Sequence, residues 1–160
     1  MPRSFVLCRR TNTMPSNASA QTPAITVAEF EQLLQTHHPF SALLGAEVLE
    51  IGVGTATLLL PDDAAHKRLG GIVAGPMLMG LADLALYAAI VGATGNAEAV
   101  TASLSINFLR KTPPGGVLAH ARVLKTGRTC AGDVTLVPAV GGEPVAQVIS
   151  TWGLPTPRAT

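Results

Sequence analysis

Residues 70–95 form a long apolar segment with one charged side chain, the carboxylate of Asp83. Burying that charge costs several kcal/mol unless it is paired or solvated, because apolar surroundings cannot replace its hydration shell. A structural role, in which Asp83 bonds the backbone or Tyr87 one turn later, and a chemical role are both open at this stage. The fold must therefore surround an apolar segment and still give Asp83 a partner or solvent.

We expect most of this segment to be one long helix. Gly75 can serve as its N-cap, and Pro76 suits the first helical position, where a missing N–H costs nothing. Gly92 and Gly95 follow the last apolar turn as stops. Apolar residues cover the whole circumference of residues 76–91, which indicates that other structure surrounds the helix. A membrane span is the less favoured alternative, because an Asp at its centre costs about 2.5 to 3.5 kcal/mol and no second span follows.

Four segments after the helix have the pattern of antiparallel strands. In residues 100–108 every second residue is apolar, which places Val100 and Leu104 on one face and Thr101 on the other. Alternation returns after the turn segments PPGG, KTGRT and GGE. We therefore expect a four-stranded antiparallel meander, with strands over residues 100–108, 117–124, 130–138 and 144–152.

Two further elements precede the long helix. Thr26 and Glu29 have the spacing of a capping box, and the helix that they start should end before Pro39. Residues 45–61 contain two extended runs around a Gly-Val-Gly turn, which predict a hairpin or one bulged strand. The whole order of elements predicts an α+β fold, in which a curved antiparallel sheet closes around one central helix.

The composition limits the number of domains and the possible partners. A chain of 160 residues that is 48% hydrophobic suits one domain with a substantial core. With 11 basic and 10 acidic residues the net charge is near zero, which argues against a nucleic-acid or membrane-surface partner. Cys8 and Cys130 form neither a metal-ligand spacing nor a disulfide framework, so we expect a cytoplasmic protein.

The four histidines give no metal or cofactor signal. His37 and His38 lie just before Pro39, and we interpret them as surface or packing residues. His66 and His120 have no companion ligands at metal-binding spacing. We therefore predict that the protein uses no metal and no cofactor.

Residues 1–25 differ from the rest of the chain. They are rich in Ser, Thr, Asn and Pro and contain no acidic residue. We predict a disordered tail there, followed by a domain over residues 26–157. The Arg and Ser bias also resembles that of a transit peptide, and Met14 is an alternative first residue, so these interpretations stay open.

The helix start and Asp83 together indicate a reaction. A helix N-terminus offers unpaired N–H groups for a developing oxyanion, and a desolvated carboxylate is a better base or nucleophile than a hydrated one. Gly75 and Asp83 lie about 12 Å apart along the helix, too far to act on one carbonyl. Gly75 of one chain must therefore face Asp83 of another. The sequence predicts an oligomer, at least a dimer, with shared sites.

The segment GGIVAGPMLMGLADLALYAA, followed by TASLSINFLRKTPPGGVLAHARVLKTGRT, resembles the PaaI-like branch of the hotdog-fold acyl-CoA thioesterases. The resemblance covers about residues 38–155. It implies a hotdog fold, a homodimer or homotetramer, and hydrolysis of an acyl-CoA to a free acid and coenzyme A. It leaves the acyl group unnamed.

The same resemblance implies roles for particular residues. Asp83 falls where these enzymes carry the acid that attacks the thioester or orients the attacking water. Gly75 falls where a backbone N–H polarises the thioester carbonyl, and Thr101 where some relatives hold a Ser or Thr that helps to fix the water. Four basic residues lie near segments that meet the coenzyme A phosphates, namely Arg110, Lys111, Lys125 and Arg128.

The helix start departs from the family pattern. Many relatives have a His and two Gly where this chain has Ala74, Gly75 and Pro76, and several have an Asn at the position of Arg68. We group Arg68 and Pro76 with the substrate-binding residues, and we expect the departures to affect substrate and rate more than reaction class. The alternatives are a non-catalytic acyl-CoA-binding module and a hotdog dehydratase or hydratase, which generally pairs its acid with a His.

Overall fold

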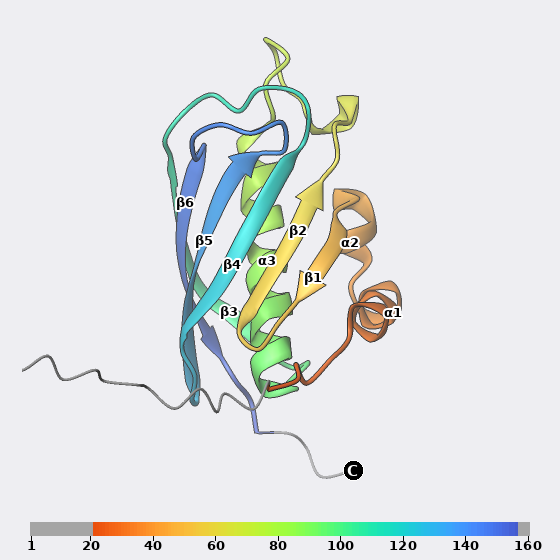
Figure 1. The fold of residues 1–160 in the computed structure, drawn as a ribbon, viewed down its shortest axis with the longest axis vertical. Helices are drawn as coiled ribbons and strands as arrows, with labels where there is room; N and C mark the ends of the chain where they lie inside the picture. The colour runs from red at the N-terminus through yellow and green to blue at the C-terminus, as the bar shows by residue number, and fades with distance from the viewer. Residues whose placement is uncertain (1–20, 157–160) are drawn as a thin grey trace, which may run out of the picture.

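A six-stranded antiparallel sheet curves around one long helix, α3 (Gly75–Thr94), in a computed structural model (Figure 1). The strands are β1 (Glu47–Ile51), β2 (Thr55–Leu60), β3 (Val100–Phe108), β4 (Val117–Lys125), β5 (Thr129–Pro138) and β6 (Ala146–Gly153). The structure describes residues 21–156. The predicted α+β plan, a curved sheet around one apolar helix, is confirmed.

The predicted tail, with its transit-peptide and Met14 alternatives, lies mostly outside the described residues, and its boundary at residue 25 stays a prediction. Just before that boundary, the N–H of Ala24 donates to the carbonyl of Gly92 over 2.8 Å. This bond ties the chain before the first helix to the last turns of α3.

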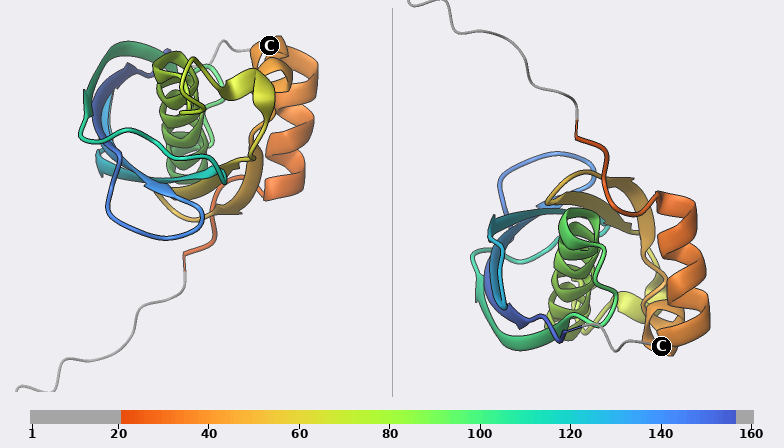
Figure 2. Two further views of the ribbon diagram at one scale, coloured as in Figure 1. Left: turned by 90° about the horizontal axis from the view of Figure 1, so that it is seen from above. Right: turned by 90° about the horizontal axis from the view of Figure 1, so that it is seen from below.

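Two short helices precede the sheet. In α1 (Val27–His37) the capping box of Thr26 and Glu29 forms as predicted. The second helix, α2 (Pro39–Leu44), begins directly after His38 and was not predicted from the sequence. Proline suits the first turn of a helix, so Pro39 ends one helix and starts the next. Seen along α3, the sheet curves around the helix and α1 lies beside the β1 edge (Figure 2).

The β1–β2 hairpin forms around Gly52–Gly54, and a register shift between Val48 and Glu50 adds a bulge to it. Both features that the sequence offered as alternatives are therefore present. The 3-10 turn η1 (Ala64–His66) and residues 67–74 then lead into α3.

The predicted meander is correct for β4, β5 and β6 but wrong for β3. The strand order is β1-β2-β4-β5-β6-β3, so β3 pairs with β6 and not with β4. Residues 109–116 do not form a tight turn; they carry the chain from the β3 edge past the ends of β6 and β5 to β4, at the end of the sheet near the start of α3 (Figure 1). Antiparallel pairing fixes the relative direction of two strands but does not require them to be neighbours in the sequence. The connection of residues 109–116 is long enough to reach β4 from the β3 edge.

The strict alternation predicted for β3 is also wrong at its start. The register between β3 and β6 shifts between Thr101 and Ser103, which is the mark of a β-bulge. Thr101 is paired with the buried Trp152, and Leu104 with the buried Ser150. The bulge therefore turns Thr101 toward α3, on the same inner face as Leu104.

The start of α3 differs by one residue from the prediction. Ala74 is the N-cap, without a side-chain hydrogen bond, and Gly75 is the first helical residue. Gly95 ends the helix in a left-handed conformation, as predicted. Gly92 is not a stop, because it lies within the helix, where a Cβ atom would lie 2.5 Å from the carbonyl oxygen of Gly52. Glycine is needed there because α3 packs closely against the β1–β2 turn.

Most of α3 is buried in the concave face of the sheet. Its length and hydropathy would allow it to cross a membrane, but 67% of the apolar window is buried within the domain, as in any core helix. Leu81 and Ile90 pack with sheet residues such as Leu58 and Leu136. The face that carries Pro76, Met79 and Asp83 is left partly open.

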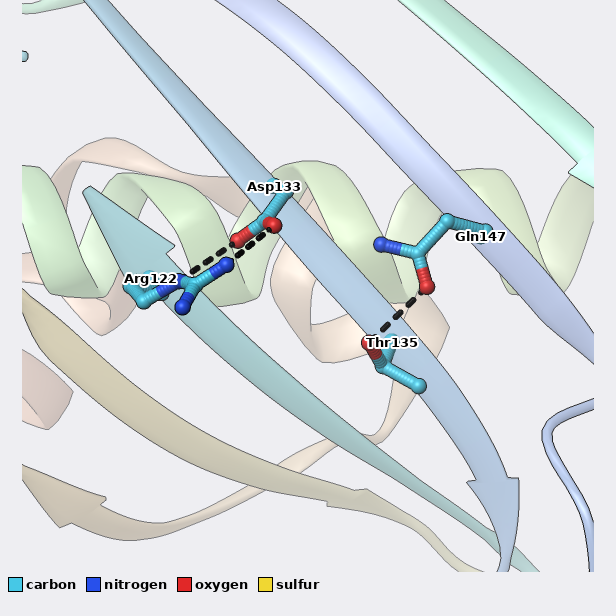
Figure 3. Close-up of polar contacts among 4 residues, drawn as sticks. All are labelled: Arg122, Asp133, Thr135 and Gln147. Carbon is cyan, nitrogen blue, oxygen red and sulfur yellow. Dashed lines mark hydrogen bonds and ion pairs between the residues drawn. The ribbon is translucent and has the colours of Figure 1, made fainter. Parts of the chain in front are cut away.

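Polar pairs lie on the outer face of the sheet (Figure 3). The guanidinium of Arg122 on β4 donates two hydrogen bonds to the carboxylate of Asp133 on β5, at 3.2 and 2.8 Å. The hydroxyl of Thr135 donates to the side-chain oxygen of Gln147 on β6 over 2.9 Å. These cross-strand pairs support one register, while the buried face supplies most of the stability.

We expect Gly92→Ala to lower the free energy of unfolding by about 1 kcal/mol or more, because overpacking against backbone outweighs the better helix propensity of alanine. Urea denaturation measures this. Gly80→Ala is the matched control, since its Cβ atom would meet the Phe40 ring at 3.1 Å and no backbone. A Gly92→Ala protein as stable as Gly80→Ala would contradict the packing argument.

Candidate active site

Asp83 lies on the partly open face of α3, half-buried, next to the start of β3. The hydroxyl of Thr101 donates a hydrogen bond to Asp83 Oδ1 over 2.6 Å. This bond depends on the bulge in β3, because strict alternation would turn Thr101 away from the helix. Within the described residues, the carboxylate has no other side-chain hydrogen-bond partner. One carboxylate oxygen is therefore free to meet a ligand or water.

A pocket of 280 Å³ opens beside this carboxylate. Tyr87, one turn after Asp83, and Trp152 form an aromatic wall, with ring centroids 6.0 Å apart and planes 13° from parallel. The hydroxyl of Tyr87 donates to the carbonyl of Ala97 over 2.7 Å and so is not free to react. His38 and Phe40 form the rim on the side of α1 and α2. The pocket is thus mostly apolar, with two carboxylates in its lining, those of the half-buried Asp83 and the exposed Glu98.

Burial raises the pKa of the Asp83 carboxyl above its ordinary value, because the charged form loses hydration. The Thr101 hydrogen bond and the nearby charge of His38 oppose that shift and lower the pKa in part. A carboxylate whose pKa is raised holds a proton more strongly and is a stronger base. Asp83 therefore has the environment of a general base or nucleophile.

His38 is a site residue that the sequence analysis treated as surface or packing. Its ring lies 5.1 Å from that of Tyr87, and the side chain lines the Asp83 pocket. Its backbone caps both α1 and α2, which fixes where the ring projects. The His-Pro pair marked a helix boundary in the sequence, but no local signal placed that boundary over α3.

A second pocket, of 430 Å³, lies at the start of α3. Gly75 contributes to it, and a Cβ atom there would lie 3.2 Å from the ring of Phe108 at the end of β3. No hydrogen bond joins the Gly75 N–H to another residue in the part of the chain that the structure describes. An unpaired N–H at a helix start is a ready donor to an anion.

The basic residues predicted to bind substrate fall into two groups. Arg68, Arg110 and Lys111 line the Gly75 pocket, beside the exposed Pro76. Arg110 is already engaged, since it pairs with Glu143 and donates to the carbonyl of Pro144. Two others lie on or next to the turn between β4 and β5, at the opposite end of the sheet, namely Lys125 and Arg128.

One chain therefore brings together Asp83 with Thr101, and Gly75 with three basic residues, but it keeps these two groups apart. They lie in separate pockets, one at the Val100 end of β3 and one at the Phe108 end. A carbonyl group cannot reach both within one chain.

Comparison with known proteins places the chain in a family. Residues 70–131 match the Thioesterase superfamily. A mutant structure of the phenylacetic acid degradation protein PaaI from Thermus thermophilus is 30% identical, with 72% of this chain and 97% of that chain aligned and a TM-score of 0.64. The chain belongs to the PaaI-like hotdog thioesterases. The predicted resemblance is thereby confirmed.

Other PaaI-like and thioesterase structures have the same fold. Zebra fish thioesterase superfamily member 2 is 25% identical, with 82% of this chain and 99% of that chain aligned and a TM-score of 0.73. PaaI of E. coli is 23% identical, with a TM-score of 0.66 over 77% of this chain and 93% of that chain, and supports the fold alone. Membership in this hotdog family makes the chain a hydrolase and supports acyl thioesters in general as its substrates.

We expect Asp83→Asn to raise the free energy of unfolding at pH 7. The folded chain holds the Asp83 proton more strongly than the unfolded chain, so stability falls as pH rises from 3.8 through the raised pKa. Asparagine removes this loss and still accepts the Thr101 hydrogen bond. Urea denaturation at several pH values measures both the increase in the free energy of unfolding and the change in its dependence on pH.

Asp62→Asn is the matched control, because Lys67 holds the pKa of Asp62 below its ordinary value. That substitution should give no gain in stability at pH 7. Equal unfolding free energies for wild type and Asp83→Asn at neutral pH would contradict the desolvation of Asp83.

Proposed function

We propose that the protein hydrolyses an acyl-CoA thioester to a free acid and coenzyme A, at a site shared between two chains. The observation that carries this proposal is Asp83, a carboxylate with a raised pKa, bonded to Thr101 in the wall of an apolar pocket. We place the enzyme in the cytoplasm, since Cys130, the only cysteine within residues 21–156, is buried and free.

In the proposed reaction, Asp83 acts as the general base toward water. The carboxylate takes a proton from the water as the oxygen adds to the thioester carbon, and the carbonyl oxygen becomes an oxyanion. When the carbon–sulfur bond breaks, the protonated Asp83 gives that proton to the departing thiolate, so coenzyme A leaves as a free thiol and the carboxylate is regenerated. Thr101 holds Oδ1 and so leaves the other oxygen for water. In the covalent alternative Asp83 attacks the carbonyl carbon, the carbon–sulfur bond breaks to release the thiolate, and water then cleaves the acyl–Asp83 anhydride to the free acid. Both routes need the carboxylate.

The Gly75 N–H of the partner subunit would donate a hydrogen bond to the oxyanion. Gly75 and Asp83 of one chain lie about 12 Å apart along α3, since each residue rises 1.5 Å. The proposal therefore needs two helices that run antiparallel, each with its start next to the Asp83 of the other.

The free edge of β3 supports this pairing. Of the described strands, β3 pairs with β6 alone, and its apolar end residues Val100 and Phe108 are 57% and 52% exposed. When a strand pairs antiparallel with its own copy across a two-fold axis, the start of one lies beside the end of the other. The Asp83 pocket at the Val100 end would thus meet the partner's Gly75 pocket at the Phe108 end.

The same pairing would bring together the basic residues of the Gly75 pocket and those at the turn between β4 and β5. Arg68 and Lys111 of one chain would lie beside the Asp83 pocket of the other, at the end of the sheet where the second chain carries Arg128. We propose that these side chains hold the coenzyme A phosphates, with Lys125 nearby and Pro76 shaping the entrance. Arg110, bound to Glu143, keeps the 109–112 segment in place.

A hydratase is the second candidate, because the structure pairs an acid with a histidine in one pocket. His38 and Asp83 line the same cavity, although no His lies in or just before α3. A hydratase would add water to an enoyl-CoA and release no thiol. A module that binds acyl-CoA without reaction would do neither.

Purified protein incubated with a panel of acyl-CoAs and a thiol-reactive dye tests the reaction. We expect release of free thiol, and a loss of at least about 100-fold in kcat for Asp83→Asn, as for removal of a general base. Loss of enoyl-CoA absorbance without thiol release would favour the hydratase, and binding without either change would favour the module. Unchanged turnover in Asp83→Asn would remove Asp83 from the mechanism.

Mixed dimers test the shared site. We expect Asp83→Asn and Gly75→Trp to be inactive as homodimers, but a randomly formed mixture to regain up to about a quarter of wild-type activity per chain. Half of the dimers are then hybrids, and each hybrid holds both lesions in one site and none in the other. Proven hybrids without recovered activity, or a fully active monomer in sedimentation, would exclude the shared site.

A further inference from the structure

We propose that Phe40 forms a wall of the acyl-binding pocket and limits the length of the acyl group that the enzyme accepts. The inference rests on the proposed function, because it assigns the acyl group to the pocket beside Asp83. Its evidence is the contact between α2 and α3 and the size of the pocket that this contact borders.

Phe40 and His38 lie on either side of Asp83 along α3. Phe40 packs against Gly80, three residues before Asp83, where a Cβ atom would lie 3.1 Å from the ring atoms Cε1 and Cζ. His38 packs against Tyr87, four residues after Asp83. The segment of residues 38–41 therefore borders the open face of α3 beside the carboxylate, with one aromatic ring before Asp83 and one after it along the helix.

Gly80 provides the space for the Phe40 ring. Any side chain at position 80 would push against that ring, so glycine lets the ring edge rest on the helix itself. Leu44, one turn later on α2, also lies within 3.5 Å of that Cβ position and is buried. Leu44 thus anchors α2 on α3, and Phe40 extends from the same face of α2 into the rim of the pocket.

The exposure of Phe40 indicates a role beyond packing. Its side chain is 57% exposed although the ring edge touches α3, whereas Leu44 is 1% exposed. A large apolar ring at a pocket rim that remains half open to solvent suits contact with an apolar ligand. Leu43 is 80% exposed on the same helix and does not line the pocket, so it offers a matched control.

The pocket that one chain contributes beside Asp83 gives an order-of-magnitude size for the acyl group. At about 30 Å³ for each water-sized unit, a space of 280 Å³ holds on the order of nine non-hydrogen atoms. A straight chain of about eight carbons with its carbonyl oxygen fills that space. We therefore assign the enzyme to medium-length acyl groups, because a longer chain would have to pass the Phe40 ring at the rim of the pocket.

The experiment measures kcat/KM for saturated straight-chain acyl-CoAs of increasing length with wild type, Phe40→Ala and Leu43→Ala. The ratio to compare is kcat/KM for an acyl chain of about twelve carbons divided by kcat/KM for one of about six. Phe40→Ala should raise this ratio tenfold or more, because each buried methylene contributes strongly to discrimination between substrates. Leu43→Ala should leave the ratio unchanged. Phe40→Trp, which narrows the pocket, should move the ratio in the opposite direction.

Gly80→Ala adds a test of the contact itself. It should change the length profile when Phe40 is present and leave it unchanged in the Phe40→Ala background, since the two residues act through one contact. Circular dichroism confirms that each variant is folded. An active enzyme whose profile is the same in wild type, Phe40→Ala and Phe40→Trp would overturn the role of Phe40 alone. A wild-type protein that hydrolyses no acyl-CoA would overturn the proposed function and this inference with it.

Discussion

The structure depends on the burial of a helix that is apolar on nearly every side. A sheet covers only one side of a cylinder, so the other side of α3 must be covered by something else. The α1–α2 pair covers part of it, and the face that carries Pro76, Met79 and Asp83 stays partly open. Asp83 can remain in so apolar a helix because it lies on this open face, where Thr101 and solvent reach it.

The Asp83–Thr101 pair forms where β3 departs from the regular alternation that places apolar side chains toward α3. A bulge at the start of β3 turns Thr101 inward, and two bonded atoms then face each other across the gap between strand and helix. A regular strand would have placed an apolar residue there. One extra residue in the strand therefore converts a hydrophobic contact into a hydrogen-bonded carboxylate.

Much of this could be predicted from the sequence, for definite reasons. The Gly-Pro start and the apolar length of α3, the capping box at Thr26 and the alternation in β4 to β6 are local patterns that only one element satisfies. The position of β3 at the edge of the sheet and its bulge could not be predicted, because pairing partners and register depend on how the 109–116 crossover runs. His38 and Phe40 could not be predicted as site residues for a similar reason, since only the tertiary contact between α2 and α3 brings them to Asp83.

Within residues 21–156 no strand pairs with the outer edge of β3, and this has a consequence for how the enzyme would respond to its own concentration. Every second backbone group on that edge points away from β6, and with the proposed partner these groups would complete a continuous sheet. Association would then stabilise the fold and assemble the site in the same step, so that both scale with protein concentration by mass action. On dilution, such an enzyme would lose activity and thermal stability together, with one midpoint set by the dimer's dissociation constant.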